Sequence, residues 1–188
     1  MNTNTTRLPR RHLLLSAAAC LGALAGLSGC ASPQPADYAQ ERPLLELDHY
    51  FNGRVRAHGI FQKRGGAVAR RFTVVMDCHW QGNEGVLDEA FTYSDGTTQR
   101  RIWRLTKHAD GHYTGTADDV VGTARGQTQG NAFRWGYTLA LPVDGKVYHV
   151  DFDDWMYLID ERVMLNRATM SKFGVRLGEI TLSFTKRT

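Results

Sequence analysis

The chain has 188 residues and a formal net charge of +4, with 42% hydrophobic residues, 19 glycines and three cysteines. This length fits one domain, and the hydrophobic content excludes a chain that is disordered throughout. The basic balance suits a nucleic-acid partner and three cysteines allow one disulfide, unless an N-terminal leader accounts for both.

The N-terminal segment has the pattern of an export signal. Arg7, Arg10 and Arg11 precede an apolar run at 13–27 that is too short, and too rich in alanine and glycine, for a membrane-spanning helix. The run ends in Leu-Ser-Gly-Cys at 27–30, which resembles the lipobox of bacterial lipoproteins. We predict a cleaved signal peptide over 1–29 and lipidation of Cys30, with general secretory and twin-arginine export both open.

The predicted lipid would hold the mature protein on a membrane through Cys30. Two or more acyl chains anchor a protein durably, whereas one does so only marginally. Ala31 and Ser32 follow the cysteine, and the lack of an aspartate there predicts the periplasmic face of the outer membrane, for a Gram-negative host. Residues 30–43 hold three prolines and few apolar side chains, so we predict a lipidated, flexible tether before a single domain at 44–188.

Loss of the leader changes the charge and the cysteine count. It removes three arginines and no acid, which leaves 20 basic and 19 acidic residues, so no nucleic-acid partner is expected. Cys20 leaves with the leader and Cys30 takes lipid, so Cys78 has no disulfide partner. Because Cys78 alternates with Met76 and Trp80 along one predicted strand, we expect a buried, inert thiol.

From residue 44 onward, short runs of alternating apolar and polar residues are separated by turn sequences. In 133–141 every odd position is apolar, which is typical of a half-buried antiparallel strand. We predict an all-β, up-and-down antiparallel meander of about ten strands that closes into a lipocalin-like barrel, with a β-sandwich as the alternative. A helical turn is expected at 44–50, and strands at 53–63, 68–81, 86–93, 97–107, 111–118, 122–129, 132–142, 146–158, 162–172 and 177–187.

Six strings of the chain resemble the bacterial lipoprotein family classed as domain of unknown function 3833. The resemblance extends over essentially the whole mature chain. It implies a lipocalin-like barrel on a lipid anchor, without an established activity or catalytic residues, and with genes that often lie near those of lipid modification. The strings are at 51–53, 70–72, 98–103, 115–122, 152–157 and 166–174.

Charged residues interrupt four predicted strand faces that are otherwise apolar. These residues are Glu89, Arg101, Asp154 and Arg167, and a buried charge is unfavourable unless it is paired. We predict that they line one barrel cavity, either as ligand-binding groups or as a structural network of salt bridges. An arginine in that cavity could bind the carboxylate of a fatty acid such as palmitate. The uncharged residues predicted for the same cavity are Trp103, Trp135, Tyr137 and Met156.

These features favour a carrier or binder of a hydrophobic ligand, a fatty acid or modified lipid. One alternative is a structural or interaction lipoprotein of the envelope, and another is a lipid-modifying enzyme that uses Asp154 and Arg167. His108 and His112 flank a predicted turn without a third ligand, so neither a metal nor another cofactor is expected. The sequence contains no nucleophile elbow, phosphate loop or dinucleotide fingerprint.

Overall fold

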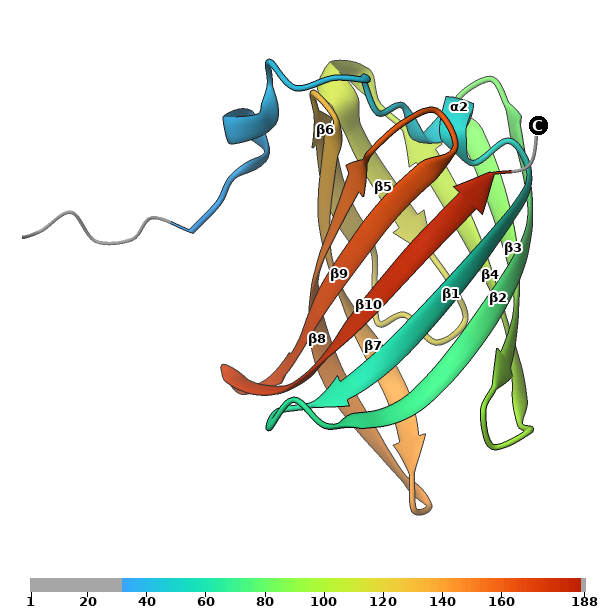
Figure 1. Cartoon of the computed structure of the whole chain (residues 1–188), viewed down its shortest axis with the longest axis vertical. Helices are drawn as coiled ribbons and strands as arrows, with labels where there is room; N and C mark the ends of the chain where they lie inside the picture. The colour runs from blue at the N-terminus through green and yellow to red at the C-terminus, as the bar shows by residue number, and fades with distance from the viewer. Residues whose placement is uncertain (1–31, 187–188) are drawn as a thin grey trace, which may run out of the picture. The chain divides into compact units, whose positions relative to one another are not determined.

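A computed structural model describes residues 32–186, in which ten antiparallel strands close into a barrel (Figure 1). Consecutive strands pair with each other, and β1 pairs with β10 to close the ring. The predicted meander is confirmed, and the β-sandwich alternative is wrong. The strands are β1 (Gly53–Lys63), β2 (Val68–Gln81), β3 (Glu84–Tyr93), β4 (Thr98–Lys107), β5 (His112–Thr116), β6 (Ala124–Gln129), β7 (Ala132–Val143), β8 (Lys146–Leu158), β9 (Val163–Lys172) and β10 (Val175–Lys186).

The strands form where the alternation and the turn chemistry agree. On β8, for example, Val150, Phe152, Asp154 and Met156 point inward and are buried, while Asp151, Asp153 and Trp155 alternate with them on the outer face. Turns that need a positive φ angle carry glycine at Gly66, Gly96 and other positions. As a result, every strand begins and ends within two residues of its predicted position.

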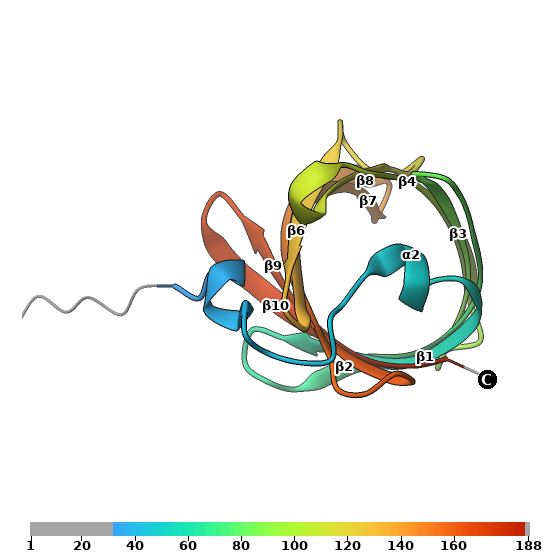
Figure 2. The same cartoon turned by 90° about the horizontal axis from the view of Figure 1, so that it is seen from above.

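A short helix, α2 (Leu47–Tyr50), closes the end of the barrel at which β1 begins, here called the upper end (Figure 2). Leu47, Tyr50 and Phe51 are each 2% exposed, so this segment acts as a hydrophobic plug. Polar contacts fasten it to the wall, because the indole nitrogen of Trp80 donates to the carbonyl of Phe51 at 3.0 Å. The helical turn predicted at 44–50 is therefore confirmed.

Residues 34–43 pack on the outside of the barrel. The 3₁₀ turn η1 (Pro35–Tyr38) places the Tyr38 ring 5.7 Å from the Trp155 ring and 5.3 Å from the Tyr157 ring of β8. Gly130 has a φ of 56°, and any side chain there would collide with the Tyr38 carbonyl. The tether predicted over 30–43 is thus wrong from residue 34 onward, while Cys30 and the predicted leader lie outside the described residues.

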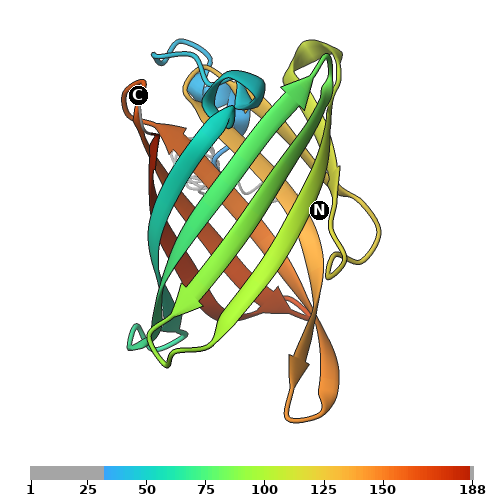
Figure 3. The ribbon, with the colours of Figure 1, turned by 90° about the vertical axis from the view of Figure 1, so that its right-hand side faces the viewer.

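The barrel interior is packed differently in its two halves. Around α2, large side chains such as Tyr50, Tyr113 and Phe133 are at most 2% exposed. Toward the other end, here called the lower end, inward-facing residues such as Tyr93 and Ile180 are only partly buried. A second 3₁₀ turn, η2 (Ala109–Gly111), lies in the β4–β5 loop at the upper end. Figure 3 shows the lower end formed by the hairpin turns.

The loop at 117–123 fills the wall below the short strands β5 and β6. The backbone of Val120 forms a bridge with Leu139, and the nitrogen of Ala140 donates to the carbonyl of Asp119 at 2.8 Å. The loop is thereby fixed against β7. Across the described residues, no helix is long and apolar enough to span a membrane.

Candidate functional site

A charged cluster lies inside the barrel where β3, β4 and the loop at 117–123 meet. Glu89 and Arg101 are register partners on adjacent strands and both point inward. One guanidinium nitrogen of Arg101 lies 2.6 Å from a carboxylate oxygen of Asp119, and another lies 3.9 Å from Glu89. Asp119 is therefore the main partner of Arg101, and Glu89 is a secondary one.

The side chains of Glu89 and Arg101 are not completely buried. Although Glu89 and Arg101 point into the barrel, 12% and 14% of their side chains remain exposed. We call the part of the barrel interior that is bounded by Glu89, Arg101 and Asp119 the inner chamber. Phe91 and Tyr93 continue the wall toward the lower end, with the Arg101 guanidinium 5.6 Å from the Phe91 ring centre. The inner chamber thus lies in the half of the barrel that is less tightly packed.

A second polar group, Asp154 of β8, is 5% exposed and fully hydrogen-bonded. The hydroxyl of Tyr137 donates to its carboxylate at 3.0 Å, and the indole nitrogen of Trp135 at 3.2 Å. The amide nitrogen of Asn166 donates to the other carboxylate oxygen. Three donors therefore satisfy a carboxylate that an apolar interior would otherwise disfavour.

Glu89 differs from Asp154 in its partners. Within the described chain no donor forms a hydrogen bond to the Glu89 carboxylate, and its nearest cation is the Arg101 nitrogen at 3.9 Å. Burial raises the pKa of Glu89 to about 7, with Arg101 lowering it and Asp119 and Asp154 raising it. Glu89 therefore exchanges a proton near neutral pH.

The pKa of Asp154 is raised less than burial alone would raise it. Burial brings this pKa to about 6, against the lowering effect of the hydrogen bonds from Asn166, Trp135 and Tyr137. Burial and the neighbouring Asp154 together raise the pKa of the Tyr137 hydroxyl well above its ordinary value. Tyr137 is therefore a neutral hydrogen-bond donor at physiological pH.

Aromatic rings surround these polar groups. The Trp103 and Trp135 ring centres are 4.6 Å apart, and the Tyr137 and Phe152 rings stack at 5.0 Å. Trp103, Trp135 and Met156 are at most 7% exposed, so they belong to the packed core more than to an open wall. Seven of the eight residues predicted for one cavity do point into the barrel: Glu89, Arg101, Trp103, Trp135, Tyr137, Asp154 and Met156.

Arg167, the eighth residue predicted for the cavity, does not point into the barrel, so this prediction is wrong. Its side chain is 64% exposed on the outer wall, where it lies 2.7 Å from Glu179. The alternation along β9 predicts the wrong face for Arg167 because its apolar neighbour Leu165 is itself 44% exposed on the outer wall. An enzyme that pairs Asp154 with Arg167 is also excluded, since the barrel wall separates the two side chains.

Two interior residues, Asp119 and Asn166, are not predicted by the sequence pattern. Asp119 lies in a loop, where alternation gives no direction for a side chain. Asn166 alternates with the buried Met164 and Ala168 and is 3% exposed, so the same signal that identified Asp154 could have found it.

Two other reactive side chains within the described residues are Cys78 and His108. Cys78 is buried, as predicted, and burial raises the pKa of its thiol to about 12. The imidazole of His108 lies 2.8 Å from the Thr114 hydroxyl. Among residues 32–186, no three histidine, cysteine or acidic side chains come together to hold a metal ion.

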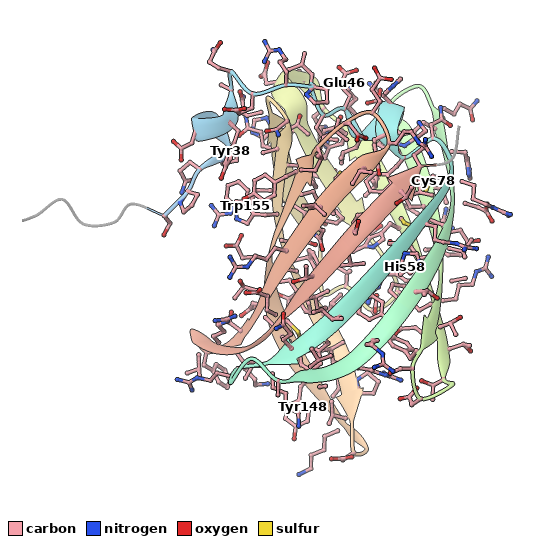
Figure 4. All side chains as sticks on the ribbon, viewed as in Figure 1. Tyr38, Glu46, His58, Cys78, Tyr148 and Trp155 are labelled. Carbon is pink, nitrogen blue, oxygen red and sulfur yellow. The ribbon has the colours of Figure 1, made fainter. Side chains whose placement is uncertain are left out.

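A groove of about 640 Å³ runs across the outer wall over β9, β10, β1, β2 and β3. Its side chains come from outward-facing cross-strand rows that include His58 and Thr73, and Figure 4 labels His58 on this wall. This groove is separate from the inner chamber because it lies on the other side of the sheet.

Comparison with known proteins supports the fold. A family model described as "Protein of unknown function (DUF3833)" matches residues 24–186. The S-type phycobiliprotein lyase from Guillardia theta aligns with a TM-score of 0.58 and 8% identity, covering 83% of this chain and 99% of its own. A DUF3598-family protein of unknown function from Nostoc punctiforme aligns with a TM-score of 0.53 and 12% identity, covering 78% of this chain and 51% of its own. No curated protein matches the sequence.

Proposed function

This chain belongs to the DUF3833 family. We propose that it is a non-enzymatic binder of a small hydrophobic ligand, and that a lipid anchor holds it on the periplasmic face of the outer membrane. The lipocalin-like barrel is consistent with binding a small ligand. The structural neighbour from Guillardia theta is titled a lyase for phycobiliproteins, which is a property of that protein.

The inner chamber supports ligand binding most directly. Glu89 is held inside an apolar barrel without a hydrogen-bond donor from the described chain. A buried carboxylate without donors destabilises a fold, so the position favours a molecule that brings a donor to it. Asp154, by contrast, has three donors of its own and serves to hold the aromatic wall in place.

The charges of the inner chamber favour one kind of polar head group. Arg101 is already engaged by Asp119 at 2.6 Å, so the carboxylate of a fatty acid would have to compete for it. Glu89 accepts a hydrogen bond when ionised, which suits a hydroxyl, amide or amine group. We therefore favour a modified lipid with a neutral, donor-bearing head group over a free fatty acid.

A binding measurement tests this preference. The chain starting at Ala31 contains every residue of the barrel and its lead-in, and its tryptophan fluorescence reports on ligand binding to the barrel. Monododecanoylglycerol should bind more tightly than dodecanoic acid. Glu89→Gln should weaken the binding of the glyceride about tenfold, because an amide is a poorer acceptor than a carboxylate.

The matched control is Asp88→Asn, because Asp88 lies on the outer wall beside Glu89 and pairs with Arg100. Equal affinities for both ligands in all three proteins would contradict the proposal.

The anchor has its own test. Cells grown with radiolabelled palmitate should incorporate label into the wild-type chain and not into a Cys30→Ser variant. Membrane fractionation should place the labelled protein with the outer membrane. Labelling of the serine variant, or recovery of the wild type with the soluble fraction, would contradict the anchored form.

A further inference from the structure

Exposed apolar side chains concentrate at the lower end of the barrel. Of the eleven large apolar residues exposed in the described chain, eight lie in the turns or strand ends there. Phe173 is the most exposed, at 91%. Figure 4 shows Tyr148 at this end and Glu46 at the opposite one. Seven of the eight come from three adjacent hairpins and form what we call the rim patch: Val68, Val143, Val147, Tyr148, Phe173, Val175 and Leu177.

The three hairpins that carry the rim patch contact each other. The ammonium of Lys172 lies 4.9 Å from the Tyr148 ring and 5.2 Å from the Phe173 ring, which joins the β7–β8 hairpin to the β9–β10 hairpin. A hollow of about 310 Å³ between them is lined by Val147 and Phe173, among others. The backbone nitrogen of Arg64, in the β1–β2 turn, donates to the carbonyl of Leu177 at 3.0 Å. The hairpins that carry the rim patch are therefore neighbours along the lower end.

A phenylalanine is an unusual residue at position 173, because the hairpin turn there does not favour it. Phe173 and Gly174 form a two-residue hairpin turn with φ angles of 51° and 74°. Such a turn prefers asparagine or aspartate followed by glycine, and the neighbouring β7–β8 hairpin has Asp144 and Gly145 there. A bulky residue at positive φ is strained, and a ring that is 91% exposed gains little from packing. Neither turn chemistry nor core packing therefore explains this phenylalanine.

The charges around the rim patch are mainly positive. Lys63, Arg64, Lys146 and Lys172 surround it, and none of them forms an ion pair with a carboxylate of the described chain. Asp144 and Asp151 are the exposed acids on the same hairpins, and Asp151 lines the hollow beside Lys172, whereas the nearby Glu179 is already neutralised by arginines. Apolar side chains ringed by unpaired cations complement an anionic lipid surface.

We propose that the rim patch is a docking surface for an anionic phospholipid bilayer, with Phe173 entering the boundary between head groups and acyl chains. Contiguous exposed apolar surface of this kind marks an interaction site. Docking would turn the lower end, and with it the less tightly packed half of the barrel, toward the bilayer. The proposal holds whether or not the inner chamber binds a ligand.

Vesicle sedimentation tests the docking proposal apart from the lipid anchor. The chain starting at Ala31 lacks the predicted leader and the lipidation site, so any binding comes from the protein surface. It should sediment with vesicles of phosphatidylglycerol and phosphatidylethanolamine, and much less with vesicles of phosphatidylcholine alone. Added salt should weaken the binding, because the lysines act through electrostatic attraction.

Two substitutions separate docking from folding. Phe173→Asn should reduce vesicle binding about tenfold through the loss of inserted apolar surface. It should leave the melting temperature unchanged or raised, because asparagine suits the turn. Lys146→Gln together with Lys172→Gln should reduce binding to the anionic vesicles specifically. Ile159→Asn is the matched control, since Ile159 is 52% exposed at the upper end, and it should bind as the wild type does.

Three results would overturn the proposal. They are no sedimentation with anionic vesicles, equal binding by Phe173→Asn and the wild type, and a dimer in solution that Phe173→Asn dissolves. The last result would assign the rim patch to a second copy of this chain. None of them bears on ligand binding to the inner chamber, which is measured without vesicles.

Discussion

The carboxylate of Asp119 lies 2.6 Å from the guanidinium of Arg101, although one belongs to a loop and the other to the interior face of β4. The loop at 117–123 also bonds to β7 through its backbone, so it bridges the wall where β5 and β6 are too short to pair further. The same contact supplies the main partner of the one arginine in the inner chamber. The ion pair therefore ties the loop to the barrel interior and neutralises Arg101 within the inner chamber.

Replacing Asp119 should destabilise the protein measurably. Asp119→Asn leaves the inward-facing Arg101 with the more distant Glu89 as its remaining partner, and we expect a loss of about 2 kcal/mol in the free energy of unfolding. Urea denaturation of the wild type and of Asp119→Asn measures this difference in the free energy of unfolding. Asp77→Asn, which breaks the exposed pair with Arg54 on the outer wall, should leave the stability nearly unchanged. Equal effects of the two substitutions would contradict the structural role of the loop.

Stability should fall with rising pH because of Glu89. Its pKa is about 7 in the folded chain against an ordinary value of 4.5, so the folded state keeps a proton that the unfolded state releases between these values. The folded state is therefore disfavoured as pH rises through this window, by up to about 3 kcal/mol. Urea denaturation from pH 4.5 to 8 should show this fall in the wild type and a flatter profile in Glu89→Gln. Parallel profiles would mean that Glu89 titrates normally.

The two arginines predicted for the cavity should behave differently. Arg167→Ala removes an exposed pair with Glu179 on the outer wall and should change the free energy of unfolding by less than about 1 kcal/mol. Arg101→Ala leaves Glu89 and Asp119 without their shared cation and should cost about 3 kcal/mol. Thermal and urea melts of the two variants provide the comparison. A larger loss for Arg167→Ala would place that side chain inside after all.

The plug at the upper end should depend on Asp48. The ammonium of Lys107 donates to the Asp48 carboxylate at 2.9 Å, and the Tyr113 hydroxyl lies 3.4 Å from it. Asp48→Ala should cost about 1 kcal/mol and speed hydrogen exchange at the amides of α2. The matched control, Asp151→Ala, removes an exposed hydrogen bond to Thr138 far from the plug. Unchanged exchange at α2 in Asp48→Ala would show that apolar contacts alone hold the plug.

Cys78 should be unreactive in the folded protein. It is 5% exposed and burial raises the pKa of its thiol to about 12, so almost no thiolate is present at pH 8. A chain carrying Cys30→Ser and starting at residue 30 should react with a thiol reagent only after denaturant is added. Rapid labelling of the native protein would indicate that the interior beside β2 opens readily.

The order and bounds of the strands could be read from the sequence because alternation and turn chemistry agree along most of the chain. The same reasoning identified Glu89, Arg101 and Asp154, whose strands have a clearly apolar inner face. It failed at Arg167, where apolar residues occupy both faces of β9 and alternation does not determine direction. It also could not place Asp119, because a loop has no periodicity, nor the packing of 34–43, which depends on Tyr38 meeting rings more than a hundred residues away.

We propose that a ligand enters the less tightly packed half of the barrel. Native mass spectrometry of the chain starting at Ala31, incubated with monododecanoylglycerol, should distinguish Ile180→Trp from Leu165→Trp. Ile180 points into that half and Leu165 points outward from the adjacent strand, so each variant adds the same ring on one side of the wall. We predict a one-to-one complex in the wild type and in Leu165→Trp, and its loss in a folded Ile180→Trp. No complex in the wild type, or an undiminished complex in Ile180→Trp, would show that the ligand does not bind inside the barrel.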